Sequence, residues 1–80
     1  MRVPRDLSGA ELIRQLEKLG YVATRQSGSH VRLTTRENGE HHVTVPNHDP
    51  LRVGTLSAIL AAVATHHGID RDRLLKRLFD

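Results

Sequence analysis

The residues best suited to chemistry in this 80-residue chain surround His30. Ser27-Gly28-Ser29 forms a turn, His30 follows it, and Arg25 and Arg32 flank the histidine in sequence. An imidazole exchanges protons near neutral pH, while turn amides and a guanidinium can hold a phosphate. RNA carries its own nucleophile, the 2′-hydroxyl, so a base, an acid and a charge-stabilising group would be enough to cleave it. By residue type and position alone, however, an exposed histidine at a strand end is the simpler interpretation.

The other histidines suggest metal or hydrolase chemistry, but their spacing favours neither. His41-His42 and His66-His67 are adjacent pairs, and neighbouring residues point to opposite faces of a strand or diverge by about 100° on a helix. The sequence has no His-Glu-x-x-His, no Gly-x-Ser-x-Gly and no cysteine,. We therefore predict no metal site and no cofactor. A position near a helix C-terminus, where a cation is favoured, sufficiently explains His66 and His67.

The first element expected to position the His30 region is an amphipathic helix. Ser8 and Glu11 fit a capping box, in which each side chain binds the backbone amide of the other residue,. Apolar residues then recur at helical spacing: Leu12, Ile13, Leu16 and Leu19,. Gly20 follows at the position where a left-handed residue commonly ends a helix.

Three strands are expected next, at residues 21–26, 30–36 and 41–45. The turn Ser27-Gly28-Ser29 joins the first two strands. Asn38-Gly39, the strongest short signal for a hairpin, joins the second strand to the third,. The chain segment that carries His30 is therefore predicted to run through the middle of an antiparallel meander.

The two faces of this predicted sheet differ in polarity. Alternation in the second and third strands puts four apolar residues on one face, namely Val31, Leu33, Val43 and Val45,. The opposite face carries His30, Arg32, Thr34, His42 and Thr44. The first strand is ambiguous, because Tyr21 and Ala23 compete with Val22 for the core side.

Two further helices complete the order α-β-β-β-α-α. We expect Thr55 to cap the second helix and Gly68 to end it, with a buried stripe formed by Leu56, Ile59, Leu60 and Val63,. Asp70 can cap a short third helix whose apolar side is Leu74, Leu75 and Leu78. The predicted fold class is α+β, with helices on one face of a three-stranded antiparallel sheet and water on the other.

The chain is short and mildly basic. A domain this small buries only about 60% of its unfolded surface, so room for a deep active site is scarce and chemistry is expected on an open face or in a shallow cleft. We expect one domain over residues 1–80, with its core at about 8–68 and an additional helix at 69–80. The net charge is +3. Between residues 18 and 36, Lys18, Arg25, Arg32 and Arg36 occur with no acid among them, a distribution that suits a phosphate backbone.

Targeting signals are missing from this sequence. No apolar run approaches the roughly 20 residues of a membrane span, and the start lacks the apolar centre of a signal peptide,. We expect a cytoplasmic protein without a membrane partner. The sequence is compatible with a monomer and with a homo-oligomer.

Three segments carry a pattern in a fixed order. The opening helix ends in Leu19-Gly20-Tyr21, and residues 25–30 read Arg-Gln-Ser-Gly-Ser-His. The third segment comprises Val45-Pro46-Asn47-His48, Leu51, Gly54-Thr55-Leu56 and Ile59-Leu60. Together they resemble the HicA, or YcfA-like, family of small mRNA interferase toxins, whose patterns are Arg-Gln-x-Gly-Ser-His and Val-Pro-x-His…Leu-x-x-Gly-Thr-Leu-x-x-Ile-Leu. The order and spacing of the segments, across most of residues 8–68, make the likeness specific.

The resemblance implies a double-stranded-RNA-binding-domain-like fold and an endoribonuclease acting as the toxin of a type II toxin–antitoxin system. The implied partners are RNA, as messenger RNA, and a HicB-like antitoxin. His30 stands where the family has its catalytic histidine, and we expect it to act in metal-independent cleavage by the 2′-hydroxyl. The residues expected to bind RNA or its phosphate are Arg25, Gly28, Ser29, Arg32, Lys18 and Arg36.

Two histidines are secondary candidates. His42 shares the wet face with His30, and His48 lies in the loop after the third strand, where ordering that loop is the favoured role. Two rival functions remain: a non-catalytic RNA-binding module of the same fold, and an interaction protein whose sheet face serves only a protein partner.

The chain departs from the family pattern in two places. Many members have a second histidine or an aromatic residue just after the catalytic one, whereas this chain has Val31-Arg32-Leu33. That difference should alter packing and substrate contacts more than the base. The third helix is also basic and could extend an RNA surface, although a solvated helix face is the simpler interpretation; its cations are Arg71, Arg73, Lys76 and Arg77.

Overall fold

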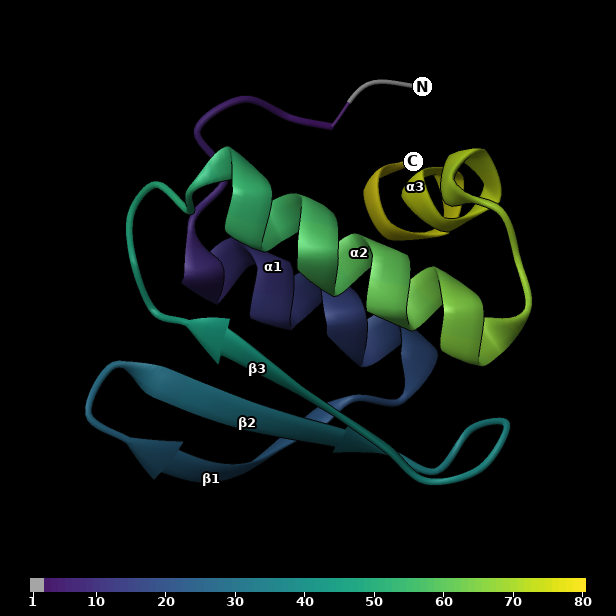
Figure 1. Cartoon of the computed structure of the whole chain (residues 1–80), viewed down its shortest axis with the longest axis horizontal. Coiled ribbons are helices and arrows are strands. Elements are labelled where there is room, and N and C mark those ends of the chain that lie inside the picture. The colour runs from purple at the N-terminus through teal and green to yellow at the C-terminus, as the bar shows by residue number, and fades with distance from the viewer. Residues whose placement is uncertain (1–2) are drawn as a thin grey trace.

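The structure is a computed structural model that describes residues 3–80. Its elements are α1 (Gly9–Leu16), the 3-10 helix η1 (Glu17–Leu19), β1 (Val22–Ser27), β2 (His30–Thr35), β3 (His41–Pro46), α2 (Val53–His67) and α3 (Arg71–Phe79). The strands form one antiparallel sheet in the order β1-β2-β3. All three α-helices lie on one side of this sheet (Figure 1). The predicted α+β class and the order of elements are therefore confirmed.

Helix α1 begins and ends largely as predicted. The Glu11 amide donates to the Ser8 hydroxyl at 3.0 Å, and the Ser8 amide donates to the Glu11 carboxylate at 3.1 Å, which completes the capping box,. The last turn tightens into the 3-10 helix η1, and Gly20 follows in the left-handed conformation with φ +81°. A side chain at Gly20 would also press on those of Thr35 and Glu37. Glycine is thus required there for both conformation and space.

The sheet faces follow the predicted alternation on β2 and β3. Val31, Leu33, Val43 and Val45 are buried against the helices, while the residues between them face solvent. For the first strand, Tyr21, which directly precedes β1, is fully buried, but Ala23 is exposed like every other residue of β1, and Val22 is 55% exposed. An irregularity between Ala23 and Arg25 shifts the register of β1 against β2, so simple alternation does not extend along this strand.

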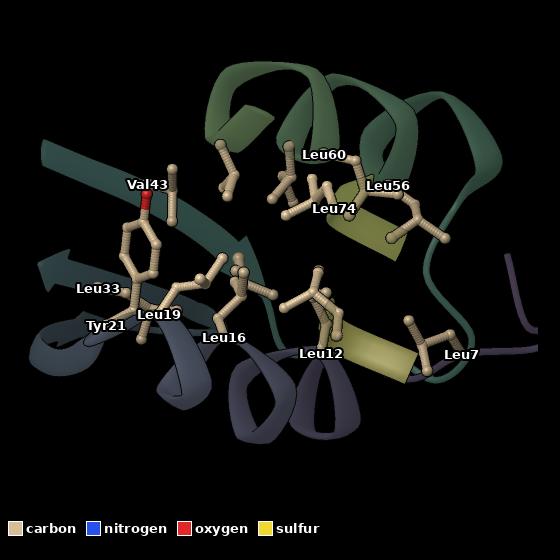
Figure 2. Close-up of a cluster of buried hydrophobic side chains, with 14 of the residues drawn as sticks. Leu7, Leu12, Leu16, Leu19, Tyr21, Leu33, Val43, Leu56, Leu60 and Leu74 are labelled. Carbon is tan, nitrogen blue, oxygen red and sulfur yellow. The ribbon is translucent and has the colours of Figure 1, made fainter. Parts of the chain in front are cut away.

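The hydrophobic core lies between the helices and the covered face of the sheet. Figure 2 shows Leu12 and Leu16 on α1 pointing toward Leu56, Leu60 and Leu74 of the other helices. The fully enclosed apolar residues are Leu12, Leu16, Leu19, Tyr21, Leu33, Val45, Leu60, Val63, Leu74, Leu75 and Leu78. Nearly all of them are aliphatic, as the composition requires.

Helix α2 begins earlier than predicted. The sequence suggested Thr55 as its N-cap, but the helix starts at Val53, with Arg52 as an N-cap that makes no side-chain capping bond. The Leu51 amide donates to the carbonyl of Leu7 at 2.8 Å. Because Leu51 is buried and anchored in this way, the chain turns into the helix directly after it, and the prediction for Thr55 is wrong.

The ends of α2 and α3 agree with the prediction. Gly68 ends α2 with φ +64°. The Asp70 carboxylate accepts a hydrogen bond from the Arg73 amide at 2.8 Å and so caps α3. No helix within residues 3–80 has the length and apolar character to cross a membrane.

The start of α1 packs directly on the chain that leaves β3. The Gly9 amide donates to the His48 carbonyl at 2.8 Å. A β-carbon at Gly9 would collide with the carbonyl oxygen of Pro46 and meet the α-carbon of Asn47 at 3.0 Å. Both obstacles are backbone atoms, so they cannot move aside as a flexible side chain could.

We therefore expect Gly9→Ala to lower the free energy of unfolding by about 1–3 kcal/mol, the usual cost of overpacking. Gly54→Ala is the matched control, because Gly54 lies in α2 and a β-carbon there meets nothing within 4 Å. That control should stabilise by about 0.5–1 kcal/mol. Urea unfolding of both variants checks the contrast, and equal stabilities would contradict the close packing.

Three histidines and a tyrosine fasten the β2–β3 turn to the end of α2. The Asn38 side-chain amide donates to His67 Nδ1 at 3.0 Å, so the proton of His67 lies on Nε2 and is donated to the Tyr21 hydroxyl at 3.1 Å. That hydroxyl in turn donates to His41 Nδ1 at 2.9 Å. His66 stacks on His41 with centroids 4.3 Å apart, and its Nε2 donates to the turn carbonyls of Glu37 and Gly39. The helix-end explanation for His66 and His67 was therefore incomplete.

This histidine cluster depends on neutral imidazoles at His41 and His67. Burial lowers the pKa of both, and the neighbouring His66 lowers the pKa of each further. Burial likewise raises the pKa of Tyr21 to about 12. His42 also lowers the pKa of His41. Arg77 and His41 lower the pKa of His67, whereas the negative charge of Glu37 raises it.

The domain should therefore lose stability on acidification. Unfolded histidines bind protons at their ordinary pKa of 6.5, above that of folded His41 and His67, so the unfolded state takes up more protons as pH falls. The contribution is complete above pH 6.5 and disappears as pH falls through the lower folded values. Urea titrations at pH 7.5 and 5.5 should show this loss, and it should shrink in a His41→Asn/His67→Gln variant. Equal losses in both proteins would contradict the role of the cluster.

Candidate active site on the wet face of the sheet

His30 opens β2 on the face of the sheet that the helices leave uncovered. Its cross-strand neighbours are Ser27 on β1 and Pro46 on β3. Two residues further along β2, on the same face, Arg32 pairs with Arg25 on β1 and with Thr44 on β3. These side chains line a shallow hollow of about 360 Å³, which we call the His30 hollow; its residues are Arg25, Ser27, His30, Arg32 and Thr44.

A tight turn delivers His30 to this hollow. Ser27 pairs with His30, so Gly28 and Ser29 form the two-residue connection between β1 and β2. Gly28 has φ +58°, a conformation that glycine adopts readily, and a β-carbon there would meet nothing within 4 Å,. The Gln26 side-chain amide donates to the Gly28 carbonyl at 3.1 Å. The Gln26 side chain therefore stabilises the turn, while the space around Gly28 is open to solvent, so a ligand can approach the turn backbone closely.

The loop after β3 is brought against the same turn. The Asn47 amide donates to the Ser29 carbonyl at 2.6 Å. His48 Nε2 and the Ser29 hydroxyl are hydrogen-bonded at 3.3 Å, and the His48 carbonyl accepts from Gly9. His48 is exposed and fastens the turn from outside the His30 hollow. This arrangement agrees with the loop-ordering role expected for His48.

His42 lies on the same face but at a distance from His30. It pairs with Thr34, whereas His30 pairs with Pro46. Four residues of β3 thus separate the two positions, which corresponds to about 13 Å along the strand. The hydroxyl of Thr34 contacts His42 Nδ1 at 2.7 Å, and Glu40 accepts from Nε2 at 3.3 Å. His42 therefore does not join His30 as an acid–base partner.

Four of the six predicted phosphate-binding residues do not line the His30 hollow: Gly28 and Ser29 form the adjoining turn, and Arg36 and Lys18 lie farther away. Arg36 lines a second hollow on the same face, of about 540 Å³. Lys18 belongs to the helical layer, where its ammonium donates to the Leu78 carbonyl at 2.8 Å near the end of α3. The structure thus gives Lys18 a role in closing a helix end, away from the His30 hollow.

The basic residues of α3 are also separate from the site. Arg73, Lys76 and Arg77 line a hollow of about 400 Å³ with Ile69, and α3 lies on the helical side of the sheet (Figure 1). Arg71 donates to the Ser57 hydroxyl at 3.3 Å. Arg73, Lys76 and Arg77 therefore line a different hollow from His30, on the helical side of the sheet.

Sequence reasoning missed Ser27 as a lining residue and did not place Thr44 beside Arg32. The strand register brings Ser27 beside His30 and Thr44 beside Arg32. Predicting that register from the sequence would require the length of both strand-connecting turns to be known to the residue. Within residues 3–80, no group of three or more histidine, cysteine or acidic side chains is arranged to hold a metal ion.

Together, the fold and the site define a small α+β protein with an open, cationic histidine site on the bare face of its sheet. A family model described as the HicA toxin of bacterial toxin-antitoxin matches residues 9–64. The chain therefore belongs to the HicA toxin family. Neither the curated proteins nor the solved structures contain a match to it, so the likeness to a double-stranded-RNA-binding domain stays a prediction.

Family membership makes the protein the toxin of a toxin–antitoxin system and implies an antitoxin partner. The matched region begins at the first residue of α1 and ends within α2. It includes the His30 turn and the loop that holds it. Helix α3 lies beyond the match, although its leucines complete the core.

Replacing Lys18 tests whether this residue stabilises the helices or takes part in the site. We expect Lys18→Met to lower the free energy of unfolding by about 1 kcal/mol, because α3 loses a charged hydrogen bond near its C-terminus. Growth inhibition by the toxin should persist in this variant. Chemical unfolding and a toxicity assay check both parts, and loss of toxicity in a folded, stable variant would return Lys18 to the site.

Proposed function

We propose that this toxin is a metal-independent endoribonuclease that cleaves messenger RNA at a phosphate bound in the His30 hollow. The observation that carries the proposal is the convergence of His30, Arg25 and Arg32 in one open hollow beside a glycine-containing turn. His30 also occupies the position of the histidine that the resemblance to the family marks as catalytic. An open hollow suits a polymer, which a deep pocket would exclude.

The proposed reaction uses the nucleophile that RNA supplies. His30 removes the proton of a 2′-hydroxyl, the oxygen attacks the adjacent phosphorus, and the 5′-oxygen of the next nucleotide leaves with a proton from an acid. The products are a 2′,3′-cyclic phosphate and a 5′-hydroxyl, so water and a redox partner are not consumed. Arg25 and Arg32 would stabilise the charge that develops on the phosphorane oxygens. The amides of Gly28 and Ser29 are further donors to the same phosphate.

The supporting structure explains how so small a protein could keep this geometry. Ser29 and His30 are fixed on one side by pairing with Ser27 and on the other by the Asn47 hydrogen bond. A base held on a strand end by two neighbouring segments needs little reorganisation on binding. We further propose that the antitoxin is HicB-like, as the resemblance implies.

Replacing His30 is the first test. Because a positioned acid or base typically contributes about 10²–10⁴-fold, His30→Ala should reduce cleavage of single-stranded RNA at least 100-fold. The free energy of unfolding should change by no more than about 0.5 kcal/mol, since the side chain is exposed,. A chelator in every reaction excludes a contaminating metal nuclease. Gly54→Ala, in α2, serves as the matched active control, and full activity of His30→Ala would overturn the assignment.

A chemically altered substrate provides an independent test. A 2′-deoxy nucleotide at the cleaved position removes the proposed nucleophile and should block cleavage while leaving binding nearly unchanged. All-DNA oligonucleotides should likewise resist cleavage. Cutting of either substrate at the same position would exclude attack by the 2′-hydroxyl. RNA binding without any cleavage by the wild-type protein would favour the non-catalytic RNA-binding module.

A further inference from the structure

A row of side chains crosses the wet face away from the His30 hollow. Val22 on β1 pairs with Thr34 on β2, and Thr34 pairs with His42 on β3. We call these three residues the His42 row. Thr34 also contacts the hydroxyl of Thr24 at 3.0 Å. With Arg36 nearby, Val22, Thr24 and Thr34 line the hollow of about 540 Å³. Catalysis at His30 leaves this row without a role.

His42 is held by both nitrogens of its ring. The Nε2 proton is donated to the Glu40 carboxylate at 3.3 Å, so Nδ1 accepts the hydroxyl proton of Thr34 at 2.7 Å. These two bonds fix the plane of a ring whose side chain remains 38% exposed. Because its nitrogens are engaged, the imidazole offers a ligand mainly carbon and π surface. A ring fixed in this way is preorganised for stacking and is poorly placed for proton transfer.

Val22 gives the row an apolar end. It is 55% exposed and is one of only two large hydrophobic residues so exposed within residues 3–80. A valine this exposed on a wet sheet face leaves apolar surface in contact with water,. A nucleotide provides an apolar base face for Val22 and a polar sugar edge for the threonine hydroxyls.

The charges on this face indicate which ligand could lie along it. Arg25 and Arg32 lie between the His42 row and His30, and Arg36 lies beyond the row. Two carboxylates lie at the row: Glu37 lines the same hollow as Val22, Thr34 and Arg36, and Glu40 accepts from His42 Nε2 at 3.3 Å. The cations thus follow the direction of β2 from His30 to the row, over about 13 Å. A polyanion that leaves the His30 hollow along β2 would stay near positive charge until it reached the row.

We propose that Val22, Thr34 and His42 form a base-binding subsite for single-stranded RNA, at least one nucleotide removed from the phosphate cleaved at His30. This inference rests on the proposed function and specifies its substrate class. A base must be unpaired and turned outward to stack on a side chain, whereas a duplex would present only its backbone. His42 acts here as a binding residue that contributes to specificity, and the chemistry stays at His30.

The test measures binding of RNA with a 2′-deoxy nucleotide at the cleavage position, in a series of single-stranded oligonucleotides of increasing length. Wild-type affinity should rise sharply at the length that reaches the His42 row. His42→Ala should lose that gain, about 5- to 150-fold, because stacking contributes about 1–3 kcal/mol per base. His42→Phe retains a stacking face and should keep most of the gain. Arg73→Ala, in α3 on the helical side, is the control and should bind like wild type.

Each outcome decides the inference separately from the proposed function. If wild type and His42→Ala gain affinity equally with length while cleavage by the wild-type protein persists, the subsite is excluded and the endoribonuclease proposal stands. Loss of the gain in His42→Phe as well would exclude stacking. Tighter binding of a duplex than of a single strand would overturn the substrate class. A wild-type protein that neither binds nor cleaves RNA would instead overturn the proposed function.

Discussion

The hydrogen bond from the Asn47 amide to the Ser29 carbonyl, 2.6 Å long, joins the two segments on which the site depends. One segment is the turn that delivers His30 to the sheet. The other is the loop that leaves β3, which is fixed in turn by the bond from Gly9 to the His48 carbonyl. The start of α1, the turn before β2 and the end of β3 therefore form one connected unit. This unit gives a physical reason for the shared spacing of segments that lie far apart in sequence.

The two faces of the sheet have separate tasks. The covered face supplies one side of the core, in which aliphatic side chains of the strands and of all three helices pack together; α1 and α2 contact the sheet, and α3 contacts α1 and α2. The bare face carries His30, His42, Arg32, Thr34 and Thr44, which the helices leave uncovered. The histidine cluster around Tyr21 lies at the end of the sheet opposite His30 and belongs to the stability of the fold. Three of the six histidines, His41, His66 and His67, thus belong to this cluster and lie apart from the proposed site at His30.

Much of this fold could be predicted from local patterns. The capping box at Ser8, the left-handed glycines and the alternation along β2 are short-range features, and each is confirmed. Features that depend on distant partners were missed or misplaced. Thr55 was taken as a cap because the anchoring of Leu51 by Leu7 is not visible in the sequence. The hydrogen bond from Lys18 to the end of α3 is likewise not visible in the sequence, and no spacing rule brings Tyr21 and His67 together.

The central claim concerns how RNA would be cut at the His30 hollow, and the chemical ends of the fragments test it most directly. Wild-type protein, incubated with single-stranded RNA in the presence of a chelator, should produce a 2′,3′-cyclic phosphate on one fragment and a 5′-hydroxyl on the other. Mass spectrometry distinguishes these ends from their alternatives. Fragments that carry a 3′-hydroxyl and a 5′-phosphate would show attack by water instead, and would contradict cleavage through the 2′-hydroxyl.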